Sequence, residues 1–439
     1  MIVVGAGIAG LTAAWRLQQR GFAVTVLEAA GQPGGRMAER QTGPIVYNTG
    51  ARLVYPFGKD FNALVRDAGM AQDVIELHSP VARCSDDSGD YRLELMPGPG
   101  SVLTDRLPWR EQVRLVRYAC ALLARRRRLC PDDLTSALQD DEITLAVHVG
   151  QRIGPHFLHR FIEPLFRGTR SWNPEEISAA FFVSTLPHLL GERRVLSFRG
   201  GMGRVTAQLA ASVPVRLNCE VGAVRRLETG GCEVACREEG RTVTLHADLV
   251  LMATEGDRVG ALLCDPLPQE REFFSSVRYN SLAVVHYAVS GTVVPGVRFF
   301  RRDASGPLAT YQQLAAAPQA GRSLAQLYCQ LTPEAATEAA AADTRELDAF
   351  VRVQVRTLFP ELDTRCVATH TQWIRSKLPV PWPGYGHAVS RFLDWQQGER
   401  RSVYYCGDYL SQALVTGAAH SGTTASALIA AHYPRIRNS

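Results

Sequence analysis

Three glycines and one glutamate near the start of the chain have the types and spacing of a phosphate-binding turn. Gly5, Gly7 and Gly10 form the pattern G-x-G-x-x-G directly after the apolar run 2–4. In such a turn the first glycine permits a tight bend, the second lets the backbone approach a pyrophosphate, and the third lets a helix pack closely on a strand. Glu28 follows roughly 20 residues later, where a carboxylate can accept a hydrogen bond from a ribose hydroxyl. The pattern predicts a dinucleotide-binding site rather than a glycine-rich turn without a ligand.

A strand, a helix and a second strand must hold these residues in place. The β-branched run 2–4 predicts the first strand, apolar residues at helical spacing predict a helix over 11–20, and the apolar run 22–27 predicts the second strand. The N-terminus of the helix offers unpaired N–H groups and the positive end of its dipole to phosphate oxygens. The predicted binding turn includes Ala6, Ile8 and Ala9.

A second glycine-rich turn follows the glutamate at once, over residues 29–37. Binding of NAD alone does not need such a turn, whereas a longer cofactor would run past the first turn and reach it. Gly35 permits a close backbone approach, and Arg36 can form charge-assisted hydrogen bonds to phosphate. The alternative is a surface loop with a solvated arginine. We predict that Ala29, Gly35 and Arg36 contact the cofactor.

The composition is that of an ordinary globular protein. The 439 residues are too many for one small core and indicate two domains or one large interleaved pair. The net charge of +5 is mild and does not indicate nucleic-acid binding. The ten cysteines are scattered without metal-binding spacing, which fits a reducing compartment. No apolar run is long enough to span a membrane, and the first predicted strand begins at residue 2, so we expect a cytoplasmic protein without a signal peptide.

The opening of the chain resembles the FAD-binding segment of the flavin amine oxidase superfamily, which includes monoamine and polyamine oxidases, protoporphyrinogen oxidases and carotenoid desaturases. The resemblance rests on V-V-G-A-G-I-A-G-L-T-A-A, on V-L-E-A and on G-G-R-M. The segment 47–52 is similar to the following turn of the family, which implies that Gly50, Ala51 and Arg52 lie near the flavin. The resemblance implies FAD as the cofactor.

Residues 247–254 resemble the strand of the family that leads back beneath the cofactor. That resemblance implies that the backbone of Val221 contacts the adenine. Residues 200–254 as a whole then form the second of three cofactor-binding segments, in the order that the family has.

The third segment, residues 402–422, is similar to the closing FAD motif of the superfamily. The resemblance implies that Gly407 and Asp408 lie at the ribityl or pyrophosphate region. Val415 and Thr416 begin the final predicted helix, and the Val415 N–H would face the flavin C2 carbonyl. A helix dipole at that point stabilises negative charge on a reduced flavin.

The fold class we expect is α/β, with a Rossmann-like FAD-binding domain interleaved with an α+β substrate domain that holds a mixed sheet and a helical insertion. We assign residues 1–75, 196–265 and 400–439 to the FAD-binding domain, and residues 76–195 and 266–399 to the substrate domain. Residues 75–195 are expected to be mostly helical, with helices over 111–129, 145–166 and 174–190.

The branch of the superfamily is less sharply indicated. Amine oxidases of the family commonly carry a lysine on the strand that enters the substrate domain. The matching run 277–285 contains no lysine, and the chain has only Lys59 and Lys377. The run Y-x-S-x-A-V-V and the segment 161–168 are more similar to protoporphyrinogen oxidases, whereas G-D-Y-L near the C-terminus also resembles carotenoid-type desaturases.

Two arginines follow the protoporphyrinogen oxidase-like segment. Arg167 and Arg170 could pair with propionate carboxylates by bidentate contacts. The alternative is a pair of surface arginines without a ligand.

The sequence therefore predicts an FAD-dependent oxidoreductase that removes two electrons from an organic substrate and forms a C=C or C=N bond. A protoporphyrinogen-oxidase-like or desaturating enzyme is the first interpretation, and an amine or amino-acid oxidase is the second. A non-catalytic binding protein on the same scaffold is the alternative from another class. The predicted partners are a small-molecule substrate and either O2 or another electron acceptor, with no metal.

Four consecutive arginines, Arg125 to Arg128, end the first helix of the predicted insertion. A solvated helix end is the plain interpretation of such a run. The alternatives are attraction to anionic lipid headgroups, which would make the protein peripheral to a membrane, or to a polycarboxylate substrate. The sequence does not indicate an oligomeric state.

Overall fold

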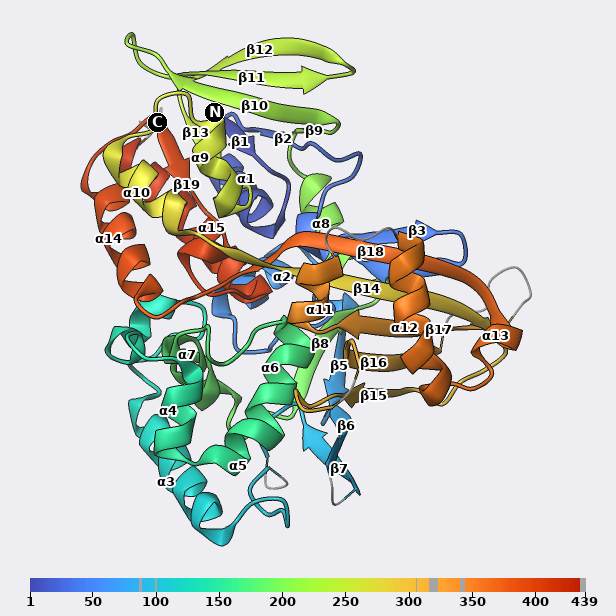
Figure 1. Ribbon diagram of the computed structural model, residues 1–439. Helices are drawn as coiled ribbons and strands as arrows, with labels where there is room; N and C mark the ends of the chain where they lie inside the picture. The colour runs from blue at the N-terminus through green and yellow to red at the C-terminus, as the bar shows by residue number, and fades with distance from the viewer. Residues whose placement is uncertain (87–88, 99–100, 305, 316–322, 340–343, 435–439) are drawn as a thin grey trace.

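The computed structural model describes residues 1–86, 89–98, 101–304, 306–315, 323–339 and 344–434. A five-stranded parallel sheet lies at the centre of its first part, in the strand order β19-β13-β1-β2-β9. The strands are β1 (Ile2–Val4), β2 (Thr25–Leu27), β9 (Val215–Arg216), β13 (Val250–Met252) and β19 (Val403–Tyr405). Three segments that are far apart in the sequence thus become neighbours, as Figure 1 shows near the two chain ends.

Two helices begin at the carboxyl ends of strands in this sheet. α1 (Ile8–Gln19) follows β1 through the glycine turn, and α15 (Val415–His432) follows β19. An antiparallel sheet of β10 (Cys219–Arg226), β11 (Cys232–Glu238) and β12 (Arg241–Ala247) lies beside the parallel sheet. α8 (Gly203–Ala210), α9 (Gly256–Leu262) and α2 (Lys59–Asp67) complete this part.

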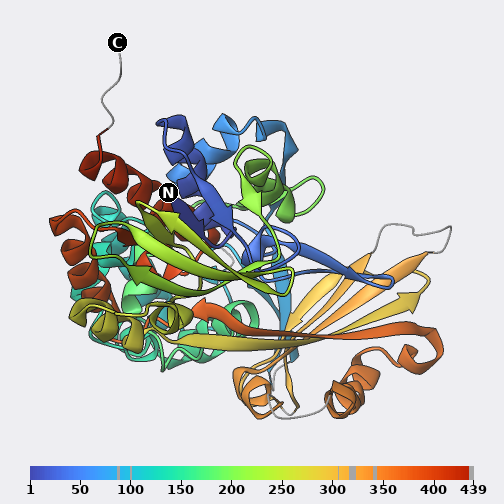
Figure 2. The ribbon, with the colours of Figure 1, turned by 90° about the horizontal axis from the view of Figure 1, so that it is seen from above.

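A seven-stranded mixed sheet forms the second part, in the order β18-β14-β17-β16-β15-β6-β7. Its strands are β6 (Val81–Asp86), β7 (Gly89–Glu94), β14 (Tyr279–Ser290), β15 (Gly296–Phe299), β16 (Leu308–Ala315), β17 (Leu324–Leu331) and β18 (Cys366–Pro379). Figure 2 shows the long strands running outward from the first part, with helices on one face. Those helices are α11 (Pro333–Glu338), α12 (Thr344–Leu358) and α13 (Leu362–Arg365).

Alternation along β14 gives this sheet two different faces. Val285, Tyr287 and Val289 pack with Leu347 and other apolar residues of α12 in one core. Successive side chains of a strand point to opposite faces, so Leu282, Val284 and His286 lie on the other face. That second face forms the wall of the candidate site.

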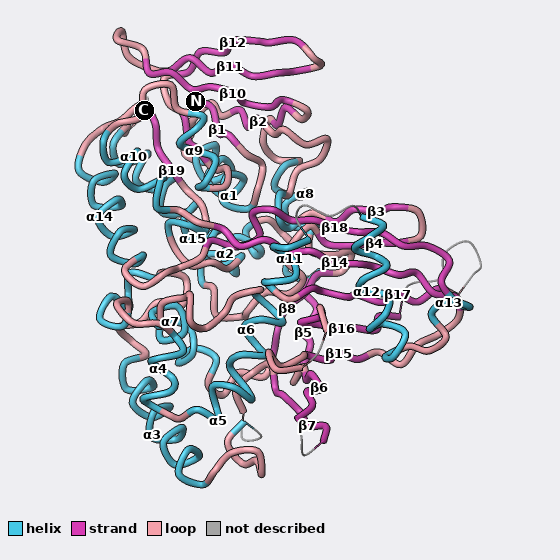
Figure 3. The backbone as a smooth tube through the Cα atoms, viewed as in Figure 1, coloured by secondary structure: helices cyan, strands magenta, loops and turns pink. Residues whose placement is uncertain are grey.

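Most helices of the insertion are confirmed by the structure. They are α3 (Trp109–Arg125), α4 (Leu145–Arg152), α5 (Pro155–Phe157), a π-helical turn (Leu158–Ile162), α6 (Glu163–Arg170) and α7 (Ala179–Leu189). Figure 3 shows these helices in cyan at the lower left, with α6 on the side next to the mixed sheet. Within the described residues, none of the helices combines the length and the apolar character that crossing a bilayer requires.

The expectation of mostly helical structure is wrong for the first part of the insertion. β5 (Val74–His78) pairs with β8 (Arg194–Phe198), and β6 and β7 extend the seven-stranded sheet. The pattern of β6 and β7 is a strand pattern, since Ala82, Cys84, Tyr91 and Leu93 alternate into a small core. β5 and β8 bring the two ends of the insertion together, and the exact domain boundaries stay a prediction.

The remaining elements cover the edges of the two parts. They are β3 (Glu39–Thr42), β4 (Ile45–Asn48), α10 (Pro268–Ser276) and α14 (Tyr385–Gly398). The fold is the α/β arrangement that the sequence predicts, with a parallel sheet and a mixed sheet built from interleaved segments.

Candidate active site

One large cavity is lined by residues of both sheets. Its volume is about 1410 Å³, more than the roughly 300–1,000 Å³ of an ordinary ligand pocket. Most of the predicted cofactor residues line it: Gly5, Gly7, Ile8, Ala9, Glu28, Ala29, Gly35, Arg36, Gly50, Ala51, Arg52, Val221, Gly407, Asp408 and Val415. Ala6, Gly10 and Thr416 lie next to these residues in the chain but do not line the cavity. The volume accommodates a dinucleotide together with a substrate.

The glycine turn after β1 has the shape of a phosphate cradle. Gly5 has a φ of +107°, and a Cβ on it would lie 2.8 Å from the carbonyl oxygen of Ala253. A Cβ on Gly7 would meet no protein atom within 4 Å, because this residue faces the cavity. A Cβ on Gly10 would lie 2.2 Å from the Gly5 carbonyl oxygen. Gly5 and Gly10 are thus required by the fold, whereas Gly7 leaves space for a ligand.

The N-terminus of α1 is free to bind an anion. Gly7 is its N-cap residue, no side chain caps it, and its first turn contains no acid. The first N–H groups of the helix and its positive dipole end therefore lie at the cavity, and the nearby carboxylate of Glu28 accepts from Ala6, just before the helix begins. This arrangement fits the pyrophosphate of FAD.

Glu28 is held rigidly at the end of β2. The backbone N–H of Ala6 donates to Oε2 at 2.7 Å, and the N–H of Ala30 donates to Oε1 at 2.9 Å. Each carboxylate oxygen has a further lone pair for a ribose hydroxyl. The position fits the predicted ribose contact.

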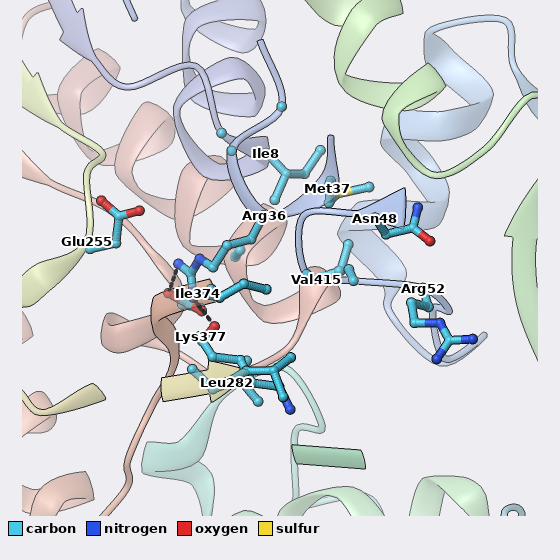
Figure 4. Close-up of a pocket in the computed structure, with 18 of the residues that line it drawn as sticks. Ile8, Arg36, Met37, Asn48, Arg52, Glu255, Leu282, Ile374, Lys377 and Val415 are labelled. Carbon is cyan, nitrogen blue, oxygen red and sulfur yellow. Dashed lines mark hydrogen bonds and ion pairs between the residues drawn. The ribbon is translucent and has the colours of Figure 1, made fainter. Parts of the chain in front are cut away.

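Arg36 and Asp408 join two of the three predicted segments across the cavity wall. The two guanidinium nitrogens donate to the two carboxylate oxygens at 2.7 and 2.9 Å. Arg36 also donates to the backbone carbonyl of Lys377 at 3.0 Å, as the dashed lines in Figure 4 indicate. The structure thus shows Arg36 paired with a carboxylate, and its contact with phosphate stays a prediction.

Three cations lie along the part of the cavity next to the mixed sheet. Arg52 donates to the side-chain oxygen of Gln312 and lies over the ring of Tyr328, 4.4 Å from its centroid. Arg170 donates to the Tyr55 hydroxyl at 2.9 Å. Within the described residues, neither these two arginines nor Lys377 forms an ion pair with a carboxylate. The two arginines, together with Lys377 when it is protonated, are therefore available to an anionic ligand.

Lys377 lines the cavity but is not among the site residues predicted from the sequence. It lies on β18, which pairs with β14, the strand that contains most of the lysine-free run 277–285. Its side chain is buried, and Nζ donates to Ser171 Oγ at 2.9 Å and to the Thr169 carbonyl at 3.3 Å. Burial above all, and then the charges of Arg170 and Arg52, lower the pKa of Lys377 to about 7. No local signal in the sequence indicates this placement, because it depends on the pairing of β18 with β14.

The pKa of Lys377 can be measured directly, because the chain contains only two lysines. In FAD-free protein carrying lysine labelled with ¹³C at Cε, one signal should titrate with a midpoint near pH 7. The ammonium is then protonated below that pH and neutral above it. The variant Lys59→Arg removes the signal of the other lysine, so the signal that remains belongs to Lys377. A midpoint near the ordinary lysine value of about 10.4 would contradict the described burial.

His286 is neutral and fixed in one tautomer. Gln326 donates its amide N–H to Nδ1 at 3.0 Å, and Nε2–H donates to Gln372 Oε1 at 3.0 Å. Gln372 in turn donates to the carbonyl of Asn48 at 2.8 Å. Burial, the largest influence, lowers the pKa of His286 to about 4. This series of hydrogen bonds connects the mixed sheet to the turn near Arg52, and it adds no charge to the cavity.

The position of Arg167 contradicts the prediction that Arg167 and Arg170 both contact substrate carboxylates. The Arg167 side chain is 4% exposed and makes a bidentate ion pair with Glu334 at 2.8 and 2.9 Å. It does not line the cavity, whereas Arg170, one helical turn later on α6, does. Arg167 is neither a surface residue nor a cavity residue, because α6 turns it toward α11.

The chain belongs to the family described as flavin containing amine oxidoreductase, whose profile matches residues 8–430. The family resemblance inferred from the sequence is therefore confirmed. The protein is a flavoprotein of an oxidoreductase family, and its cofactor is FAD.

Individual relatives are distant. Protoporphyrinogen oxidase 2 of Arabidopsis thaliana is 36% identical over 70 residues, which cover 16% of this chain and 14% of the relative. Coproporphyrinogen III oxidase of Propionibacterium freudenreichii is 26% identical over 217 residues, which cover 46% of this chain and 38% of the relative. The matches thus span well under half of the length of these relatives.

Solved structures share the fold over almost the whole chain. A putrescine oxidase has a TM-score of 0.75 at 17% identity, and 98% of each chain is covered. Cyclohexylamine oxidase of Brevibacterium oxydans has a TM-score of 0.74 at 18% identity and 99% coverage of both chains. A fatty acid isomerase of P. acnes has a TM-score of 0.70 at 18% identity and 98% coverage of both chains. At such identities the likeness shows the fold alone.

Proposed function

We propose that this protein is an FAD-dependent oxidoreductase that removes two electrons, as hydride, from an organic substrate bearing carboxylate groups. The substrate loses the hydride and a proton and gains a C=C or C=N bond, as in a porphyrinogen-oxidase-like or desaturase-like reaction. When bound, FAD supplies the two-electron acceptor, and O2 or another acceptor reoxidises it. The observation that carries the proposal is a group of three basic side chains at the cavity wall that have no carboxylate partner among the described residues: Arg52, Arg170 and Lys377.

The chemistry of the wall supports a substrate that is anionic at one end and apolar elsewhere. Leu282, Ile374 and Leu314 form an apolar strip on the same face of the mixed sheet. Such a strip excludes water from an apolar substrate body, while the cations orient its carboxylates. His286 is neutral and adds no charge of its own to this wall.

The same charges disfavour a simple amine as substrate. An ammonium group beside Arg52, Arg170 and, below about pH 7, the protonated Lys377 is repelled, and the repulsion is strongest where water is excluded. An amino acid carries a carboxylate, so an amino-acid oxidase remains the second candidate. A non-catalytic binding protein would need neither a retained flavin nor a reducible one.

Anaerobic mixing of the yellow holoenzyme with candidate substrates tests the proposal. We expect flavin bleaching with a carboxylate-bearing porphyrinogen, and much slower bleaching with the same compound after esterification of its carboxylates. An amino acid and a polyene serve as the other arms of the panel. Rapid bleaching by a primary amine that lacks a carboxylate would overturn the proposed substrate class, and a protein that cannot be reconstituted with FAD would overturn the enzymatic assignment.

A further inference from the structure

α3 carries an apolar stripe on its outer face. Trp109, Val113, Val116 and Leu123 are 69%, 49%, 47% and 43% exposed, and Cys120 is exposed between them. Their spacing of four, three, four and three residues places them on one line along the helix. No described residue buries this stripe, and Figure 1 shows α3 at the lower edge of the molecule. A soluble helix usually turns such a line toward a core.

The opposite face of α3 is packed in the apolar core of the insertion. Leu115, Tyr118 and Leu122 are buried and belong to the main apolar cluster of the insertion. The ring of Tyr118 stacks on Phe182 of α7 at 6.4 Å, and its hydroxyl hydrogen-bonds to His148 at 2.8 Å. The outer stripe is therefore not needed to hold α3 in place.

Arginines surround the stripe on its exposed side. Each of three apolar residues of the stripe is followed directly in the sequence by an arginine: Arg110, Arg114 and Arg117. Three more arginines, Arg126 to Arg128, follow the end of the helix. Arg110 stacks over the ring of Trp109 at 5.6 Å. These arginines are exposed and form no described ion pair. The outer face therefore joins apolar side chains to unpaired positive charge.

The acid of α3 does not neutralise this face. Glu111 is 6% exposed, and its oxygens accept from the backbone N–H groups of His156 and Phe157 at 3.3 and 2.9 Å. Arg125 pairs with Asp140 at 2.7 Å and is set apart from the other arginines. Glu111 therefore points inward and does not neutralise the positive charge of the outer face.

We propose that the outer face of α3 docks the protein on an anionic lipid bilayer. An amphipathic helix with an aromatic and aliphatic line beside arginines lies in the plane of the interface, with its apolar side chains among the lipid headgroups. Each arginine near a negatively charged surface adds attraction that salt weakens. The charge of the face decides between occupants. A second copy of α3 would place the arginines of two chains against each other, whereas an anionic surface complements them.

Vesicle sedimentation of the FAD-loaded full chain tests this inference. We expect binding to vesicles of mixed phosphatidylcholine and phosphatidylglycerol, weak binding to phosphatidylcholine alone, and loss of binding in high salt. The triple variant Arg126→Gln, Arg127→Gln and Arg128→Gln should bind roughly 100-fold more weakly, since each arginine contributes about 1 kcal/mol. The variant Trp109→Ser with Val113→Ser should also lose binding while the charge is unchanged.

The matched control removes three exposed arginines from other faces, as Arg66→Gln, Arg225→Gln and Arg391→Gln. It has the same net charge as the first variant and should bind as the wild type does. An unchanged flavin spectrum and thermal midpoint in every variant confirm that the fold is intact. Equal binding to both kinds of vesicle, equal loss in the control, or a dimer in analytical ultracentrifugation that Trp109→Ser with Val113→Ser dissociates would each overturn the inference. The readout does not depend on the substrate, so its failure leaves the proposed function untouched.

Discussion

Gly7→Val should give a protein that folds normally but retains no flavin. A side chain at this position meets no protein atom within 4 Å and instead enters the cradle at the N-terminus of α1. Its φ of −74° is open to any residue, so the backbone carries no penalty. The valine would fill the space into which the pyrophosphate must come, and the N–H groups of the helix would no longer reach it.

Gly10→Val is the matched control for this prediction. Its Cβ would overlap the Gly5 carbonyl oxygen and press on Ala253, so the cost falls on the fold and is about 3 kcal/mol or more. The measurements are the flavin absorbance that remains after gel filtration and the thermal midpoint of the flavin-free protein. We expect lost colour with an unchanged midpoint for Gly7→Val, and a lowered midpoint for Gly10→Val. A yellow Gly7→Val protein would contradict the placement of the pyrophosphate.

Arg170→Met should impair the oxidation of a carboxylate-bearing substrate far more than that of its ester. The methionine keeps an apolar side chain near Tyr55, Phe166 and Phe181, over which the guanidinium now lies at 5.3–5.8 Å. Loss of one buried charged contact costs about 2–4 kcal/mol, so kcat/KM for the acid should fall roughly 30-fold to 1,000-fold. The ester cannot form that contact and should be affected only slightly.

Arg167→Met is the control on the same helix. It removes a buried arginine whose partner is Glu334 and which does not line the cavity. We expect lower thermal stability with KM for the acid close to that of the wild type. The two variants are compared by steady-state kinetics with the acid and the ester of one substrate. Equal losses for acid and ester in Arg170→Met would exclude a carboxylate contact.

The cofactor end of the site could be predicted from the sequence because its signals are local. Gly5, Gly7 and Gly10 act through the backbone of one turn, and Glu28 ends the next strand of the same unit. The geometry of such a unit depends on nearby residues, so spacing alone nearly determines it. Asp408 was also predicted to lie by the cofactor, but its pairing with Arg36 was not, since the two lie far apart in the sequence.

The substrate end could not be predicted in the same way because it depends on sheet pairing. Lys377 faces the cavity only because β18 pairs with β14, and no sequence motif predicts that pairing. Arg167 and Arg170 look alike in the sequence, yet the rotation of α6 sends one to Glu334 and the other to the cavity. The strands β6 and β7 were predicted as part of a helical region because the pairing of β6 with β15, which adds β6 and β7 to the mixed sheet, is not visible in the sequence.

An experimental electron-density map of the protein with bound FAD tests the central claim most directly, namely that three distant segments of the chain form one cavity that holds this dinucleotide. The account predicts a single FAD with its pyrophosphate at Gly7, its adenosine ribose at Glu28 and its flavin ring beside Val415, with Arg52, Arg170 and Lys377 on the open side of the ring. Density for FAD outside this cavity, or a flavin ring that leaves no space beside the three cations, would contradict it.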